Sequence, residues 1–115
     1  MNLARDAVLL RIFLGENDKA NGGPLYEALV LKAREMQMAG ATVLRGPMGF
    51  GRSSRLHTAK ILRLSEDLPV VVEIVEAEDK IEAFLAAVEP MMGSGLITLE
   101  KVRVRRYGNQ QPAEA

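Results

Sequence analysis

A glycine-rich stretch with cationic side chains is the part of this sequence best suited to chemistry. Residues 45–57 read RGPMGFGRSSRLH and directly follow an apolar run at residues 41–44. Glycines let backbone N–H groups approach a phosphate or a flat base closely, and arginines pair with anionic oxygens. The stretch predicts an anion-binding loop with the ligand-contacting residues Gly49, Phe50, Gly51, Arg52, Ser53 and Arg55. The alternative is a flexible connector whose glycines serve only turn geometry. A P-loop is excluded, because no Gly-Lys-Ser/Thr follows.

Two stretches near the C-terminus can complete such a site. In VRVRRY, residues 102–107, strand alternation places Arg103 and Arg105 on one face and the valines on the other. Two neighbouring guanidinium groups make a good oligophosphate grip. Just upstream, Gly93, Ser94 and Gly95 form a second glycine loop that can supply backbone donors to the same anion. The alternatives are a solvated or salt-bridged edge strand for the arginines and a simple helix stop for the glycines.

Acid–base or metal chemistry would have to use a smaller set of residues. Glu16, Asp18 and Lys19 form a polar cluster after the first predicted strand, and His57 is the only histidine. The cluster is either a paired-carboxylate site or a solvated turn. No Asp, Glu and His set has metal-ligand spacing, so we expect no metal site. An RNA-binding sheet needs stacking aromatics on its central strands, and only Phe13 qualifies, so nucleic acid is not an expected partner.

The composition is that of a single globular domain. The chain has 115 residues, of which 48% are hydrophobic and 26% charged, and its 15 basic and 15 acidic residues cancel. Nucleic-acid binders normally carry a basic excess. There is no cysteine, which excludes disulfides and thiolate chemistry. The N-terminal apolar run is interrupted by Arg11 and lacks a signal-peptide pattern, so we expect a cytoplasmic location.

Hydrophobic periodicity predicts the elements that position these residues. We expect helices from Pro24 to Gly40 and from about 78 to 92, and strands at 7–14, 41–46, 70–76 and 96–107. This order predicts an α+β, ferredoxin-like plait (βαββαβ): an antiparallel sheet with two helices on one face and a long loop between the second and third strands. Residues 59–64, within that loop, are read as a short strand or one hairpin arm. We expect one domain over residues 1–107 and a frayed polar C-terminal tail over residues 108–115.

The first predicted strand is apolar on both of its sides. Its core-facing positions are apolar, and Leu9 and Phe13 make the opposite side apolar too. In a plait the helices cover only one sheet face, so the second face should not remain in contact with water. We therefore expect a homo-oligomer that buries this second face.

Taken together, these stretches resemble the PII signal-transduction superfamily, and more closely its short PII-like branch, catalogued as domain of unknown function family 190. The resemblance covers about residues 7–107 and rests on GENDKANGGPLYEA, GATVLRGPMGFGRSSRLHTAKILRLSEDLPVVVEIVE and GLITLEKVRV. PII proteins are trimers that bind adenine nucleotides between subunits and dock a long loop on enzymes or membrane transporters. The resemblance implies a homotrimer, an adenine nucleotide as ligand, and a membrane transporter or channel as partner, hence a location peripheral to the membrane.

Individual positions match the PII pattern unequally. Gly49 to Arg52 match the GFGR that opens the long PII loop and lies against the nucleotide, and residues 93–95 occupy the place of the second PII glycine loop. Arg103 and Arg105 resemble the PII arginines that contact phosphates. Ser53 replaces the PII glutamine used for magnesium and 2-oxoglutarate, which argues against 2-oxoglutarate sensing. No lysine stands beside the end of the second loop, so a mono- or diphosphate or a cyclic nucleotide fits as well as a triphosphate.

The sequence thus predicts a non-enzymatic regulatory protein. It would be a trimer that binds a small anionic ligand in intersubunit clefts and controls a partner through the loop around residues 49–69. One open alternative is a small oligomeric plait enzyme or metal-tolerance protein that uses Glu16, Asp18 or His57. Another is an oligomer without a ligand whose loop binds a protein constitutively.

Overall fold

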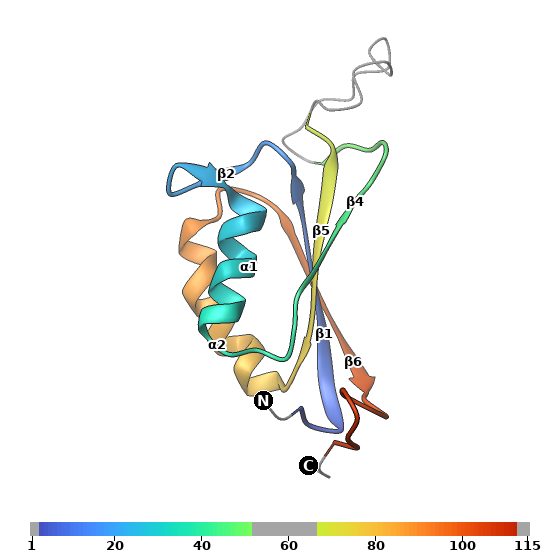
Figure 1. Ribbon diagram of the computed structural model, residues 1–115. Coiled ribbons are helices and arrows are strands. Elements are labelled where there is room, and N and C mark those ends of the chain that lie inside the picture. Colours follow the sequence, from blue (N-terminus) through green and yellow to red (C-terminus); the bar gives the residue numbers. More distant parts are fainter. Residues whose placement is uncertain (1–2, 52–66, 113–115) are drawn as a thin grey trace.

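A four-stranded antiparallel sheet forms the centre of the subunit (Figure 1). The computed structural model describes residues 3–51 and 67–112. The sheet has the order β4-β5-β1-β6, built from Thr42–Arg45, Pro69–Glu76, Asp6–Gly15 and Leu96–Arg103. Each neighbouring pair is antiparallel. β1 and β5 are therefore the central strands, and β4 and β6 form the two edges.

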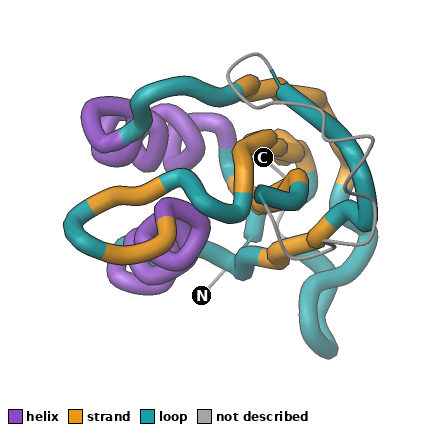
Figure 2. The backbone as a smooth tube through the Cα atoms, turned by 90° about the horizontal axis from the view of Figure 1, so that it is seen from above, coloured by secondary structure: helices purple, strands orange, loops and turns teal. Residues whose placement is uncertain are grey.

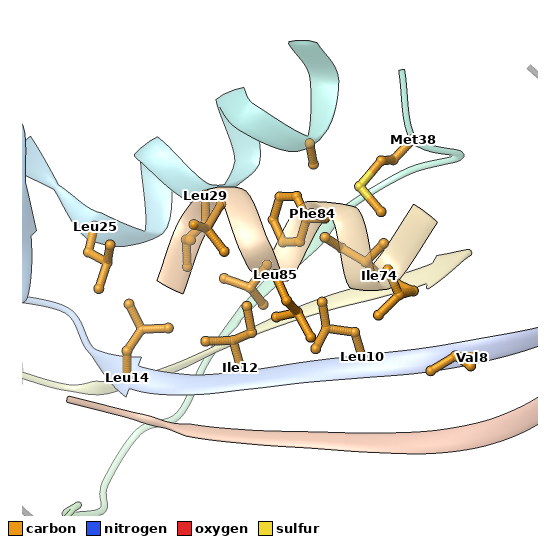
Figure 3. Close-up of a cluster of buried hydrophobic side chains, with 14 of the residues drawn as sticks. Val8, Leu10, Ile12, Leu14, Leu25, Leu29, Met38, Ile74, Phe84 and Leu85 are labelled. Atoms are coloured by element: carbon orange, nitrogen blue, oxygen red, sulfur yellow. The ribbon is translucent and has the colours of Figure 1, made fainter. Parts of the chain in front are cut away.

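Both helices cover the same face of this sheet. α1 (Leu25–Glu35) and α2 (Glu78–Val88) lie on one side of it, as Figures 1 and 2 show from two directions. Every second side chain of β1 and β5 is buried beneath them. Figure 3 shows this core, which includes Val8, Leu10, Ile12, Leu14, Leu25, Leu29, Ile74, Phe84 and Leu85. The predicted α+β, ferredoxin-like plait is confirmed, with its long loop between β4 and β5.

A small hairpin precedes α1, where the sequence predicted only a turn-rich loop. Its strands are β2 (Lys19–Ala20) and β3 (Gly23–Pro24). Asn21 and Gly22, between them, both have positive φ, which favours a tight turn. Pro24 is consequently the extended N-cap residue of α1, rather than its first helical residue as expected.

The helix ends also refine the sequence prediction. α1 ends at Glu35 and not at Gly40, because Gln37 adopts a left-handed conformation with φ of 57° and closes the last turn. α2 begins at Glu78, as predicted. It gives way to a single 3₁₀ turn that contains Pro90, which lacks the N–H needed to continue an α-helix.

Strand β6 is shorter than the sequence predicted. It ends at Arg103 rather than at Tyr107, and Arg105 lies in a bend beyond it. Tyr107 pairs with Gln110 in an isolated bridge, and its hydroxyl donates a hydrogen bond to the carbonyl oxygen of Ala39 at 2.6 Å. The residues just after β6 are therefore folded against the α1–β4 connection instead of being frayed.

A buried carboxylate joins that connection to α2. Glu76 is 1% exposed and accepts backbone hydrogen bonds from Ala39 and Ala77, each at 2.8 Å. Lys80 Nζ lies 3.5 Å from the same carboxylate and donates to the carbonyl oxygen of Gln37 at 3.1 Å. The residues that lead into β4 are thus fixed from several sides.

The sheet face opposite the helices, which we call the open face, is partly apolar, as the sequence indicated. No helix or strand among the described residues covers it (Figure 1). One cross-strand row is apolar and consists of Leu44, Val71, Phe13 and Leu96. The adjacent row is polar and consists of Thr42, Glu73, Arg11 and Thr98. Leu96 is 58% exposed in the subunit, which is unusual for a large apolar residue next to other apolar residues.

Candidate functional site

Three connections meet at one end of the sheet, the upper end in Figure 1. They are the turn after β1, the two ends of the long β4–β5 loop, and the glycine loop between α2 and β6. The strand register places them together, because Pro69 lies opposite Gly15 and Leu96 lies opposite Phe13, close to the end of β1. Both glycine stretches selected from the sequence therefore lie at this end.

The two ends of the long loop are tied to each other and to β1. The Gly46 N–H donates to the Pro69 carbonyl, and the Glu16 N–H donates to the Leu68 carbonyl, each at 2.8 Å. A Cβ on Gly46 or Gly49 would lie 2.9 Å or 3.1 Å from the Pro69 side chain, so glycine permits this close approach. The predicted ligand residue Gly49 thus packs at the base of the loop.

Phe50 presents an apolar surface next to this base. Its side chain is 69% exposed, and Met48 and Gly51 are exposed as well. An exposed aromatic ring can stack on a base or dock into a partner protein. The other predicted loop residues, Arg52, Ser53, Arg55 and His57, lie outside the described residues, as does the strand or hairpin arm expected at 59–64.

The second glycine loop packs on the end of β1. Gly95 has a φ of +149°, and a Cβ there would lie 3.2 Å from the Phe13 carbonyl oxygen and 3.1 Å from the Met92 side chain. Only glycine adopts such a backbone without strain. Nothing lies within 4 Å of a Cβ built on Gly93, and Ser94 is exposed. The loop is therefore tightly packed at its end and open at its start, where a ligand can approach the backbone.

The two glycine stretches lie at opposite edges of the sheet. Gly49 follows the edge strand β4, and Gly95 precedes the other edge strand, β6. With about 4.8 Å between neighbouring strands, the outer strands of four are roughly 14 Å apart. One subunit therefore brings these stretches to the same end of the sheet but does not bring them into contact.

Arg103 and Arg105 lie at the other end of the molecule from the glycine loops. Arg103 is opposite Asp6, at the start of β1, whereas Leu96 is opposite Phe13. The 8 residues of β6, at about 3.3 Å each, separate its ends by roughly 23 Å. Both arginines are exposed, and Val102 and Val104 are less so, in line with the predicted alternation. Within one subunit they do not join either glycine loop.

The polar cluster after β1 is engaged within the subunit. Glu16 forms an ion pair with Arg45 at 2.5 Å, and Asp18 accepts a hydrogen bond from the Gly15 N–H at 3.0 Å. Among the residues that the structure describes, no group of three or more His, Cys, Asp and Glu could hold a metal ion. These contacts favour a structural role for Glu16 and Asp18 over acid–base chemistry.

Two residues at the loop base were not selected from the sequence. Arg45 ends β4 and pairs with Glu16 across the end of β5. Asp67 has a φ of 44°, accepts a hydrogen bond from the Asn17 N–H at 3.2 Å, and fills the space that a side chain on Gly15 would need. Aspartate tolerates left-handed backbone, so an Asp two residues before a proline was the available signal.

Comparison with known families gives the chain its place. The family model DUF190, described as Uncharacterized ACR, COG1993, matches residues 7–104. The chain belongs to the DUF190 family. A UPF0166 protein from Aquifex aeolicus (strain VF5) is 43% identical over 96 residues, covering 84% of this chain and 90% of that protein. UPF0166 protein MJ1524 from Methanocaldococcus jannaschii is 33% identical over 99 residues, covering 85% and 91%.

Solved structures similar to this DUF190 chain are PII-like proteins. CPII from Thiomonas intermedia K12, bound to ADP and bicarbonate, superimposes with a TM-score of 0.63 at 17% identity, covering 88% of this chain and 90% of that one. The PII-like signalling protein TTHA0516 from Thermus thermophilus gives 0.60 at 17% identity, covering 90% and 93%. These likenesses show the fold, and they confirm the resemblance to the PII-like branch seen in the sequence.

The search for membrane-spanning helices was negative. Among the described residues, no helix is both long and apolar enough to cross a bilayer.

Proposed function

We propose that this protein is a non-enzymatic PII-like regulator. It acts as a cytoplasmic homotrimer that binds a small anionic ligand, with an adenine nucleotide as the leading candidate, in clefts between subunits. The loop around residues 49–69 then controls a partner protein. The observation that carries the proposal is the position of the two glycine stretches, at the same end but at opposite edges of one sheet.

That position calls for a neighbouring subunit. In a closed ring the same two different patches meet at every interface, so edge β4 of one subunit can face edge β6 of the next. This contact would bring Gly49–Gly51 of one chain to Gly93–Gly95 of another. Both edges also carry partly exposed apolar residues, Val43 on β4 and Leu99 on β6, which an edge-to-edge contact would remove from water.

The chemistry of the two stretches suits an anion. Each offers backbone N–H groups on glycines that no side chain shields, and such groups bind phosphate or carboxylate oxygens without needing a lysine. CPII, a PII-like protein of the same fold, has been solved bound to ADP, AMP and bicarbonate. Adenine nucleotides and bicarbonate are therefore the first ligands to test here.

The exposed residues at the loop base suit a protein partner. Met48 and Phe50 are large apolar side chains that the subunit leaves in water, and such residues commonly anchor interfaces. The resemblance to PII proteins makes a membrane transporter or channel the expected class of partner, which would place the protein at the membrane surface through that partner.

Calorimetric titration of the full chain with ADP, ATP, AMP, cyclic AMP and sodium bicarbonate tests the ligand. Sedimentation equilibrium measures the assembly, and chromatography of the nucleotides after incubation measures turnover. We expect three subunits per particle, saturable binding of at least one ligand, and no conversion. A stable monomer at micromolar concentration or nucleotide turnover would contradict the proposal.

A further inference from the structure

The centre of the open face carries a charged cluster that the ligand site does not use. Arg11 Nε donates to Glu73 Oε2 at 2.9 Å, and Arg11 Nη1 lies 3.6 Å from Glu100 Oε1. The three residues come from three adjacent strands, β1, β5 and β6. The cluster thus spans the middle of the face.

Apolar side chains enclose this cluster on both sides. Toward the loop end lies the row that consists of Leu44, Val71, Phe13 and Leu96. Toward the other end, Leu9 lies opposite Val75. A charged island within an apolar surface is typical of an interface in which the apolar part supplies affinity and the charges fix the register.

Within the cluster the three side chains are bound unequally. Arg11 and Glu73 are 39% and 29% exposed and share a well-formed hydrogen bond, whereas Glu100 is 64% exposed and lies beyond hydrogen-bond distance of Arg11. Glu100 therefore contributes little to the isolated subunit. Its carboxylate and the remaining donors of Arg11 are available to a second molecule.

The signs of these charges select the occupant of the face. Two carboxylates and one guanidinium on the same patch make the face complementary to itself, since an outward carboxylate of one copy can meet the guanidinium of another. A strongly basic or strongly acidic partner would meet a like charge instead, which disfavours its binding.

We propose that the occupant is a second copy of this chain and that Glu100 of each subunit pairs with Arg11 of the next. The inference rests on the proposed homotrimer and adds the contact that fixes how its subunits align. In a closed ring each subunit then gives one carboxylate and receives one. Every Arg11 is held between its own Glu73 and the neighbour's Glu100.

The decisive variant is Glu100→Gln. Because Glu100 is weakly held in its own subunit, this change should leave the subunit fold intact and weaken association by about 10- to 100-fold, the effect of losing a hydrogen bond to a charged group. The matched control is Glu35→Gln, which removes the exposed member of a surface ion pair on α1, with Lys32 at 3.3 Å. The control should associate like the wild type.

Arg11→Met gives a second reading, since it leaves two carboxylates unpaired at the interface. Association should weaken by about 100-fold or more. Replacing Arg11, Glu73 and Glu100 together by methionine should retain association but broaden the stoichiometry, because apolar contacts alone do not fix register.

Sedimentation velocity over a dilution series, with circular dichroism to confirm folding, reads out all variants. An unchanged dissociation constant for Glu100→Gln, or one sharp mass for the triple variant, would overturn the inference while leaving the proposed trimer intact. A monomeric wild type would end both. If Arg11→Met does not fold, Glu100→Gln decides alone.

Discussion

The backbone N–H of Ala39 donates a hydrogen bond to the buried Glu76 carboxylate at 2.8 Å. This contact links the end of the α1 turn to the last residue of β5, and the carbonyl of the same Ala39 accepts the Tyr107 hydroxyl. A short peptide segment is thus held by a core carboxylate on one side and by the C-terminal residues on the other.

We predict that Glu76→Ala destabilises the subunit by about 2–4 kcal/mol, because two backbone N–H groups lose their buried acceptor. Urea unfolding followed by circular dichroism measures this change. The control, Glu82→Ala on the exposed side of α2, should stay within about 0.5 kcal/mol of the wild type. Equal effects of the two variants would argue that the Glu76 contacts do not stabilise the fold.

We predict that Gly95→Ala destabilises the protein by about 1–3 kcal/mol, because its φ of +149° and the nearby Phe13 carbonyl exclude a side chain. Gly93→Ala is the matched control, since nothing lies within 4 Å of its Cβ position, and it should unfold like the wild type. Thermal unfolding of both variants is the measurement. A larger effect at Gly93 would contradict this account of the loop.

We predict that Phe13→Asp dissociates the oligomer. Phe13 lies on the open face, in the apolar row between Val71 and Leu96, so the change introduces an unpaired carboxylate where subunits should meet. Light scattering after size-exclusion chromatography should show a monomer. Leu31→Asp, on the exposed side of α1, should keep the wild-type mass. An unchanged mass for Phe13→Asp would mean that this face is not the interface.

We predict that Arg103→Ala or Arg105→Ala weakens a bound phosphate ligand by about 10- to 100-fold, with little effect on folding. Lysine should restore only part of the affinity, since it lacks the planar two-pronged contact. Calorimetry with ADP measures both, and Lys101→Ala, an exposed neighbour on β6, is the control. Because Arg103 is far from Gly95 within a subunit, unchanged affinity in the double alanine variant would assign the anion to the glycine loops alone.

The sequence predicted those elements whose periodicity is set by the core. β1, β5 and α2 alternate or repeat in step with burial, so their type and approximate bounds could be found. The end of α1 could not, because Gln37 rather than the obvious Gly40 takes the left-handed conformation. The end of β6 was also missed, since VRVRRY keeps its alternation beyond the point where strand pairing stops.

The candidate site was predicted as a set of residue types but not as an arrangement. Glycine spacing identified both loops, and the packing of Gly49 on Pro69 and of Gly95 on Phe13 gives those glycines a physical reason. Their separation by the width of the sheet depends on strand order, which local patterns do not encode. For the same reason the sequence brought Arg103 closer to the loops than one subunit allows.

The hydrogen bonds from Gly46 to Pro69 and from Glu16 to Leu68 have a consequence for how this protein can change. They close the base of the β4–β5 loop independently of what lies between, so the scaffold holds a fixed gap that different segments can bridge. Doubling the length of such a loop adds only about 0.6 kcal/mol of closure entropy. The subunit is therefore a frame into which foreign loops can be grafted, so that recognition can diverge while the fold beneath it is preserved.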